Sequence, residues 1–363
     1  MENKTIVVVS KSLSNNGAER VLSELIRIWV AEGYQLIIVQ TAPVKENATF
    51  DLPKDVQFHN IEKKTAFKPI RFIQESISLV KILKKYPRAT ALSFLSAPSF
   101  VLAISSLFTN NRVILSERND PQRCPPDKIQ NRLRNLAFRF ADACVFQTDQ
   151  ALNYFPPTVR KKGTIIPNPV KPDLPYRIEG RSKVIMTACR LAKQKNLPML
   201  IDAFEKIHRE HPDYTLEIYG KGEEEQTIKN IIKCKKLENA VKLKGFSNDI
   251  HSVMQKAEIY VCSSDYEGIS NSILEAMCIG MPVISTDCPV GGSKMVIQNK
   301  VNGLLTPVGD SQALYGAIKL LIENDVLYNT ISRNAVAIRD QYPISVINKR
   351  WLKVLFPEQS QVI

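Results

Sequence analysis

Short apolar runs alternate with longer segments of helical periodicity along the whole chain. Thr5–Val9 and Val184–Ala188 are unbroken or nearly unbroken apolar runs, a pattern typical of strands buried on both faces of a parallel sheet. The segments that follow them, Ala18–Glu32 and Leu197–Glu210, place apolar residues at helical spacing. Because a strand, a helix and a second strand form a right-handed βαβ unit, the pattern predicts an α/β protein with parallel sheets.

The alternation runs through two similar halves separated by a proline-rich, aperiodic segment that is typical of a linker. We expect a Rossmann-like domain over 1–168, a linker over 169–183, a second Rossmann-like domain over 184–340, and a helix in 341–363 that packs back on the first domain. Two such domains would face each other across a cleft at the carboxyl ends of their strands. The remaining expected strands of the two halves are Gln35–Gln40, Val56–Ile61, Ala89–Leu95, Val113–Leu115, Ala143–Gln147, Thr164–Pro167, Thr215–Tyr219, Val241–Leu243, Ala257–Cys262, Pro282–Ser285 and Leu304–Thr306.

The charge of the chain is unevenly distributed. The formal net charge is +13, and residues 1–165 hold 24 Lys and Arg against 14 Asp and Glu. This excess indicates an anionic partner for the first half: a membrane surface, a phosphate-bearing substrate or a nucleic acid. From Lys63 to Arg88 eight basic residues stand against Glu75 alone, in a helix with an apolar face. A solvated basic face and contact with a membrane interface both fit this segment.

The cysteines and the apolar stretches indicate the compartment of the protein and whether it spans a membrane. The seven cysteines include no C-x-x-C pair, which argues against a disulfide framework or a zinc site and favours a reducing compartment. The run Ile6–Val9 is too short for a signal peptide. The uncharged stretch Ala89–Asn111 is long enough to span a bilayer, but its serines and Pro98 favour a strand followed by a buried helix. We expect a soluble or peripheral protein.

Two carboxylates stand out between a strand and a helix. Glu267 lies in the loop and Glu275 on the helix of the segment Ser263–Met277. A strand that ends in a polar loop and a helix N-terminus leaves backbone N–H groups free beside acceptors, which suits a phosphorylated, hydroxylated ligand. The alternative is an ordinary capping box formed by Ser272 and Glu275.

Cations and glycines follow other strands. Arg190 and Lys195 lie on the loop after the first strand of the second half, where they could grip a diphosphate or form a solvated basic loop. Gly17 follows the first strand of the chain, and Gly220 and Gly222 follow Thr215–Tyr219, so each could admit a ligand or merely turn the chain. There is no G-x-G-x-x-G and no Walker motif, which argues against dehydrogenases and NTPases.

In combination these motifs resemble the retaining glycosyltransferases of family 4, which have the GT-B fold of two Rossmann-like domains. The resemblance rests on the E-x7-E pair, on Arg190 and Lys195, on Gly220-Lys221-Gly222, on Gly17-Ala18-Glu19-Arg20, and on the turn Pro289–Gly292. It covers nearly the whole chain. Ser116–Pro121 further resembles the members that build bacterial surface polysaccharides and lipid-linked oligosaccharides.

The resemblance implies a role for each site residue. Arg190 and Lys195 would hold the diphosphate of a nucleotide sugar and stabilise it as it leaves, Glu275 would bind the ribose, and Glu267 would contact the donor sugar as the third catalytic residue. Further donor-side residues would be Gly17, Gly220, Gly245, Phe246, Gly268, Ile269, Ser270 and Asn271. The acceptor side would comprise Glu19, Arg20, Ser96, Glu117 and Arg118. Neither a metal ion nor a cofactor other than the nucleotide sugar, a co-substrate, is expected.

One departure from the family pattern concerns a histidine. Many members carry a His after the fourth strand, whereas Ser93–Pro98 of this chain contains none. The contact that this His would make to the donor sugar would fall to another group, and Ser96 and Glu117 are the candidates.

The expected function is therefore a retaining, metal-independent transfer of a hexose or N-acetylhexosamine from a UDP-sugar. The acceptor would be lipid-linked or a polysaccharide, in lipopolysaccharide or capsule synthesis, at the cytoplasmic face of the plasma membrane and without nucleic acid. Two alternatives stay open: a UDP-sugar 2-epimerase of the same fold, and a non-catalytic protein that binds anionic surfaces. Transfer to an added acceptor separates the first, and survival of activity in Glu267→Ala would favour the second.

Overall fold

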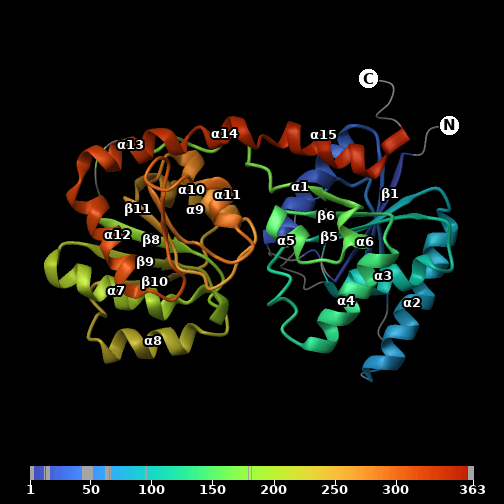
Figure 1. Cartoon of the computed structure of the whole chain (residues 1–363), viewed down its shortest axis with the longest axis horizontal. Helices are drawn as coiled ribbons and strands as arrows, with labels where there is room; N and C mark the ends of the chain where they lie inside the picture. The colour runs from blue at the N-terminus through green and yellow to red at the C-terminus, as the bar shows by residue number, and fades with distance from the viewer. Residues whose placement is uncertain are drawn as a thin grey trace. The chain divides into compact units, whose positions relative to one another are not determined.

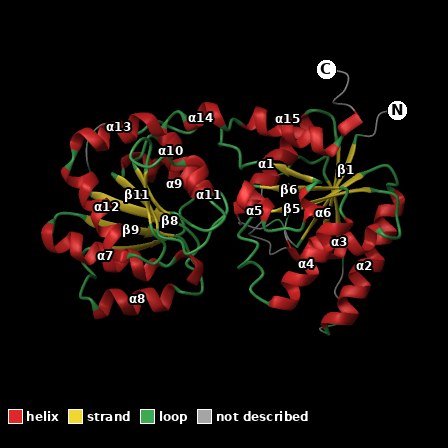
Figure 2. Ribbon diagram, in the orientation of Figure 1, coloured by secondary structure: helices red, strands yellow, loops and turns green. Residues whose placement is uncertain are grey.

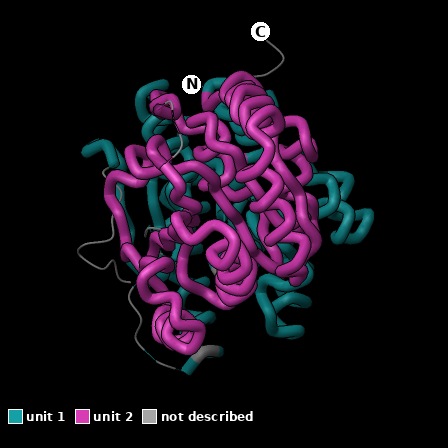
Figure 3. The backbone as a smooth tube through the Cα atoms, turned by 90° about the vertical axis from the view of Figure 1, so that its left-hand side faces the viewer, with its two compact units in different colours: residues 1–167, 345–363 teal, residues 168–344 magenta. Residues whose placement is uncertain are grey.

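The structure, a computed structural model, divides the chain into two compact units (Figure 3). Unit 1 comprises residues 1–167 and 345–363, and unit 2 comprises residues 168–344. The described residues are 4–11, 13, 17–42, 52–61, 65, 67–94, 96–178, 180 and 182–358, with the side chains of 68, 96 and 97 left out.

Unit 1 is built on a parallel sheet of seven strands in the order β3-β2-β1-β4-β5-β6-β7. Val7 of β1 lies opposite Ile37 of β2 and Ala91 of β4, so β1 is flanked on both sides. This placement explains its unbroken apolar sequence, because both faces of a central strand are covered. The strands are β1 Thr5–Ser10, β2 Gln35–Gln40, β3 Gln57–Asn60, β4 Thr90–Ser93, β5 Arg112–Glu117, β6 Ala143–Phe146 and β7 Gly163–Ile165.

Helices cover both faces of this sheet. α2, α3 and α4 lie along one face and α1 and α15 along the other (Figure 1). α15 is the expected C-terminal helix: its fully buried Trp351 stacks on Phe94 with ring centroids 5.0 Å apart, and Asn348 Oδ1 accepts a 2.8 Å hydrogen bond from Trp29 Nε1. The helices are α1 Gly17–Ala31, α2 Lys68–Lys85, α3 Ser96–Ser106, α4 Lys128–Phe140, α5 Asp149–Asn153, α6 Pro157–Arg160 and α15 Ile344–Leu355.

Unit 2 repeats the architecture with a parallel sheet of six strands in the order β10-β9-β8-β11-β12-β13 (Figure 2). One core joins the sheet to α7, α8 and α12, and a second joins it to α9 and α10. The strands are β8 Val184–Ala188, β9 Thr215–Tyr219, β10 Val241–Gly245, β11 Ile259–Cys262, β12 Val283–Thr286 and β13 Leu304–Thr306. The helices are α7 Leu197–Glu210, α8 Glu225–Cys234, α9 Ile250–Lys256, α10 Asn271–Ile279, α11 Gly292–Val296, α12 Ser311–Glu323, α13 Asp325–Ala335 and α14 Ile338–Gln341, with the 3-10 turn η1 at Lys193–Lys195.

The segment expected as a linker packs against unit 2. Val170 forms a bridge with Pro343, Arg177 N donates to Ile279 O at 2.7 Å, and Ile178 N donates to Gln255 O at 3.2 Å. The proline-rich segment is therefore irregular in conformation and packs on unit 2.

The uncharged stretch Ala89–Asn111 contains β4 and α3, as the sequence predicts, and ends just before β5. Across the described residues, no helix combines the length and apolar character needed to cross a membrane.

Candidate active site

The loops that follow β8 and β11 come together at the carboxyl edge of the unit 2 sheet. Because β8 and β11 are paired neighbours, Lys195 of η1 meets Glu267 of the β11–α10 loop, and Lys195 Nζ donates to Glu267 Oε2. Ser264 Oγ donates to the same oxygen at 3.2 Å. The structure thus joins two candidates that are 72 positions apart in sequence.

A set of hydrogen bonds fixes these two loops on each other. Ser263 Oγ donates to Lys195 O at 2.8 Å, and Asp265 N donates to Gln194 O at 2.9 Å. Asn196, in the left-handed conformation at φ 43°, caps α7 and donates through Nδ2 to Asp265 Oδ1 at 2.7 Å. Lys195 and Glu267 are therefore held in place before a ligand binds. Electrostatic stabilisation of a transition state requires charges that are preorganised in this way.

Charge and burial act on Lys195 in opposite directions. Burial by itself would lower the pKa of the ammonium group. The charge of Glu267 and its hydrogen bond, with contributions from Cys262 and Cys189, outweigh burial and raise the pKa of Lys195 above its usual range. Lys195 is therefore a permanent cation near neutral pH.

Arg190 lies on the same loop but is exposed. Within the described part of the chain, its guanidinium makes no hydrogen bond or ion pair. An exposed guanidinium on the same loop as the Lys195 ammonium group offers five N–H donors to an anionic ligand.

The glycines beside this site let backbones approach each other. A Cβ on Gly220, which has φ +133°, would overlap the carbonyl oxygen of Cys189, and a Cβ on Gly222 would overlap that of Leu191. Leu191 N donates to Lys221 O at 3.0 Å. Close packing of the β8 and β9 loops accounts for both glycines without a ligand.

Glu275 is buried on α10 and lies beside His251 of α9, with 3.3 Å between Oε2 and Nε2. The capping box considered for Ser272 and Glu275 is wrong. α10 begins at Asn271, its N-cap is Ser270 without a side-chain cap, and Ser270 Oγ lies 3.0 Å from Ser272 Oγ. Glu275 therefore sits within the helix, and its carboxylate points to α9.

Sequence reasoning missed Asn168, a buried residue that supports the loop before α10. Its Nδ2 donates to Ile269 O at 2.8 Å and to Asn271 Oδ1 at 2.7 Å. Its place in Asn168-Pro169 was the available signal, because an Asn before proline marks an irregular turn. Gln194 was missed as well: its Nε2 donates to Tyr266 O at 2.7 Å, so it helps to shape the Glu267 loop. Among the donor-side candidates of this loop, Ile269 and Ser270 are buried and Asn271 begins α10.

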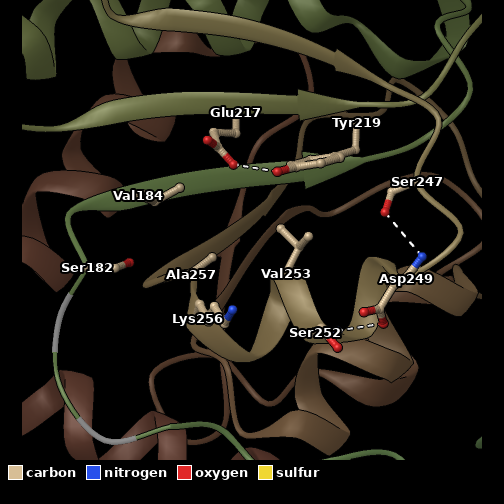
Figure 4. Close-up of a pocket in the computed structure, with 10 residues that line it drawn as sticks. All are labelled: Ser182, Val184, Glu217, Tyr219, Ser247, Asp249, Ser252, Val253, Lys256 and Ala257. Carbon is tan, nitrogen blue, oxygen red and sulfur yellow. Dashed lines mark hydrogen bonds between the residues drawn. The ribbon is translucent and has the colours of Figure 1, made fainter.

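A pocket of about 400 Å³ opens beside the β10–α9 loop of unit 2 (Figure 4). Two donor-side candidates stand directly before the lining residue Ser247 in sequence. Gly245 ends β10 with φ +68°, and Phe246 is exposed. In the pocket wall Tyr219 donates to Glu217 Oε2 at 2.6 Å. The lining residues are Ser182, Val184, Glu217, Tyr219, Ser247, Asp249, Ser252, Val253, Lys256 and Ala257.

The candidates in unit 1 have different surroundings. Gly17 begins α1, Glu19 of its first turn is buried, and Arg20 is half-buried. The side chain of Ser96 lies outside the described residues.

Glu117 ends β5 and is engaged in a buried network. Its Oε1 accepts from the backbone N of Arg118 and Asn119, and its Oε2 lies 3.3 Å from Arg134 Nη1. Arg118 is buried too, with its guanidinium over the rings of Phe94 and Trp351. These contacts give both residues a role in holding the loop after β5.

Two Rossmann-like units with parallel sheets define the GT-B class of fold. An Anabaena protein, Alr3699/HepE, solved with UDP and glucose, is similar over all of both chains, with a TM-score of 0.82 at 22% identity. Sucrose-phosphate synthase from Thermosynechococcus elongatus has a TM-score of 0.86 at 15% identity, over 99% of this chain and all of that one. These similarities establish the fold.

Residues 175–337, which lie within unit 2, match the model of the family Glycosyl transferases group 1. A Campylobacter jejuni N-acetylgalactosamine-N,N'-diacetylbacillosaminyl-diphospho-undecaprenol 4-alpha-N-acetylgalactosaminyltransferase is 24% identical over 348 residues, 89% of this chain and 92% of the relative. An uncharacterized glycosyltransferase of Haemophilus influenzae is 29% identical over 174 residues, 48% of this chain. That match spans about half of the relative's length (49%).

Proposed function

We propose that the protein is a retaining glycosyltransferase that transfers a sugar from a nucleotide sugar, with Lys195, Arg190 and Glu267 as its catalytic residues. The observation that carries the proposal is the preorganised Lys195–Glu267 pair, with the exposed Arg190 on the same loop as Lys195. All three residues lie in unit 2, within the region that matches the family model.

Each residue has a defined role in this reaction. Arg190 and Lys195 bind the diphosphate and stabilise the negative charge that grows on it as the bond to the sugar breaks. Glu267 holds Lys195 in place and accepts from hydroxyls of the donor sugar, whose anomeric carbon develops positive charge. Glu275 accepts from the ribose hydroxyls. Two cations, of which Lys195 is held by Glu267, supply the leaving-group stabilisation that a metal ion supplies elsewhere, so the proposal includes no metal and no cofactor.

The acceptor hydroxyl attacks the face of the sugar that the diphosphate leaves, which retains the anomeric configuration. The leaving diphosphate takes the proton of that hydroxyl, so the new glycosidic bond and the broken phosphate ester balance.

The comparisons support a UDP-sugar and a glycan acceptor. Alr3699/HepE was solved with UDP and glucose, and the Campylobacter relative is named for an undecaprenol-linked acceptor. A Bacillus subtilis relative, 29% identical over 206 residues, is named as a poly(glycerol-phosphate) alpha-glucosyltransferase. We extend this to a hexose or N-acetylhexosamine transferred to a lipid-linked or polysaccharide acceptor in surface glycan synthesis. The basic first half would hold the protein at the anionic cytoplasmic face of the plasma membrane.

A thermal-shift screen of nucleotide sugars tests the donor. A ligand at about 100 times its Kd stabilises the folded state by about 2.7 kcal/mol, so the true donor should raise Tm more than other nucleotides. Transfer is then measured with that donor and candidate acceptors, and the product is examined for an α or β linkage.

Glu267→Gln should remove turnover, while Glu225→Gln, in an exposed ion pair with Lys229, should not. Interconversion of the free UDP-sugar without transfer would establish the epimerase instead. Full activity in Glu267→Gln would contradict the catalytic assignment.

A further inference from the structure

Helix α4 exposes an apolar stripe along its outer side. Its large apolar side chains follow one another at intervals of four, three and four residues, which places them on one face of the helix. The stripe consists of Ile129, Leu133, Leu136 and Phe140, which are 67%, 36%, 41% and 43% exposed. Apolar residues at this spacing normally face a core. The exposure of these side chains therefore needs an explanation, and it indicates a surface that binds a partner.

The inner side of the same helix is occupied by Arg134 together with the buried Ala137 and Phe138. Arg134 is 1% exposed and donates to Cys124 O at 2.6 Å and to Pro121 O at 2.8 Å, in addition to its ion pair with Glu117. Turning the stripe inward would strip these partners from a buried guanidinium and a buried carboxylate. The outward orientation of the stripe is therefore fixed by the fold.

The neighbouring helices also expose apolar side chains. α2 and α4 both pack against α3, and all three lie on one face of the unit 1 sheet (Figure 1). Exposed apolar side chains on and next to α2 and α3 are Phe67, Ile70, Ile73, Ile77, Leu107 and Phe108. Three helices on one face of the sheet therefore each contribute large exposed apolar side chains, more than single scattered residues on an ordinary surface.

Basic side chains accompany the stripe. α4 contains no acidic residue, and Lys128, Arg132 and Arg139 are exposed beside the apolar positions. In α2, Glu75 is the sole acid, and it lies 3.6 Å from Arg71, whereas Lys81, Lys84 and Lys85 are exposed. Apolar side chains flanked by Lys and Arg are the composition of helices that lie in the interface of an anionic bilayer.

We propose that the apolar stripe of α4, with the exposed apolar side chains of α2 on the same face of the sheet, inserts into the headgroup–acyl boundary of an anionic membrane leaflet. Charge complementarity favours this occupant over a second copy of the chain, because a symmetric dimer through α4 would bring like cations together. The inference extends the proposed association with the membrane from electrostatic attraction to insertion. It is independent of the proposed sugar transfer.

A single tryptophan reports insertion directly. Trp29 and Trp351 are fully buried and give a constant background, so Leu133→Trp adds an exposed reporter. With vesicles of phosphatidylcholine and phosphatidylglycerol, its emission should shift to the blue and be quenched by brominated acyl chains. The matched control Val326→Trp, at a 78% exposed position on α13, should show neither.

Flotation with the same vesicles measures how substitutions in the stripe change membrane binding. Ile129→Ser with Leu136→Ser should weaken partitioning into these vesicles by at least about tenfold, the effect of withdrawing one or two aliphatic side chains from an apolar phase. Arg132→Gln with Arg139→Gln should weaken it by about fivefold for each cation removed. Val326→Ser should leave it unchanged, and circular dichroism checks that each variant is folded.

The outcomes are distinguishable. Flotation without a blue shift, and unaffected by the serine variants, would overturn insertion and leave only electrostatic adsorption. No flotation at low salt would overturn both claims about the membrane. A dimer in solution that the serine variants dissociate, without vesicle binding, would assign the stripe to a second copy and overturn the proposal. None of these results depends on sugar transfer.

Discussion

Each unit contains an ion pair near the carboxyl end of a central strand, and the two pairs differ in accessibility. Glu117 and Arg134 of unit 1 have side chains 5% and 1% exposed, and backbone and side-chain groups of the same unit surround them. Lys195 and Glu267 of unit 2 have side chains 15% and 17% exposed, and the exposed Arg190 lies on the same loop as Lys195.

This difference indicates two uses of similar chemistry. An ion pair whose charged groups are buried and already hydrogen-bonded within the protein stabilises a loop, because no donor or acceptor is left for a ligand. A pair that keeps contact with solvent can exchange water for a ligand. Each pair has its carboxylate at or just after the end of a strand in an α/β sheet, so position alone does not separate a structural pair from one proposed to be catalytic.

The largest effect should come from breaking the buried pair. Arg134→Met should lower the free energy of unfolding by about 3–5 kcal/mol, because it leaves the Glu117 carboxylate buried without its counter-charge. Urea unfolding measures the loss. In the control Lys229→Met, which breaks an exposed pair, the change should stay within about 0.5 kcal/mol.

This loss should depend on pH. Burial raises the pKa of Glu117, with Arg134 and two backbone N–H groups opposing it. Without Arg134 the folded state of the variant binds a proton more readily than the unfolded chain, so stability should fall as pH rises above the unfolded pKa of about 4.5. A destabilisation that is equal at pH 5 and pH 8 would contradict this account.

The next largest effect should come from the accessible pair. Lys195→Met should reduce kcat for the proposed sugar transfer by about 10²–10³, the usual result of removing a group that stabilises developing charge. Its Tm should change less than that of Arg134→Met. A variant that loses stability but keeps kcat would make this pair structural as well.

His251→Gln should have an intermediate effect on binding of the nucleotide. His251 lies 3.3 Å from Glu275 and so positions the carboxylate proposed to bind the ribose. We expect the Kd for the nucleoside diphosphate to rise by about tenfold, with kcat at saturation changed little. Calorimetry measures the Kd. In the control His211→Gln, which removes a partner of the exposed Glu323, it should stay unchanged.

The smallest effect concerns the thiols beside the accessible pair. Burial is the main cause that raises the pKa of Cys189 and Cys288 from 9.0 to about 12, so near neutral pH each holds about a thousandfold less thiolate. Iodoacetamide should modify the exposed Cys234 of the native protein first. Peptide mapping measures the order, and modification of Cys189 or Cys288 as fast as Cys234 would show that this region opens.

The alternation of apolar runs by itself determined most of the fold. β8, β9, β13 and α7 have the predicted bounds, because a buried parallel strand and an amphipathic helix each impose a local period on sequence. The short helices α5, α6 and α11 escaped prediction, since a single turn carries too little periodicity. The motifs around Glu267 and Lys195 indicated which residues are candidates for the active site.

Only the tertiary structure decided how those residues are used. The contact between Lys195 and Glu267 depends on the pairing of β8 with β11, and the position of Glu275 beside His251 depends on the packing of α9 against α10. The orientation of α4 depends on its buried face, where Arg134 finds its partners beside Ala137 and Phe138, and this leaves an apolar stripe outside. Periodicity shows that a helix has two faces, but long-range contacts choose which face is buried.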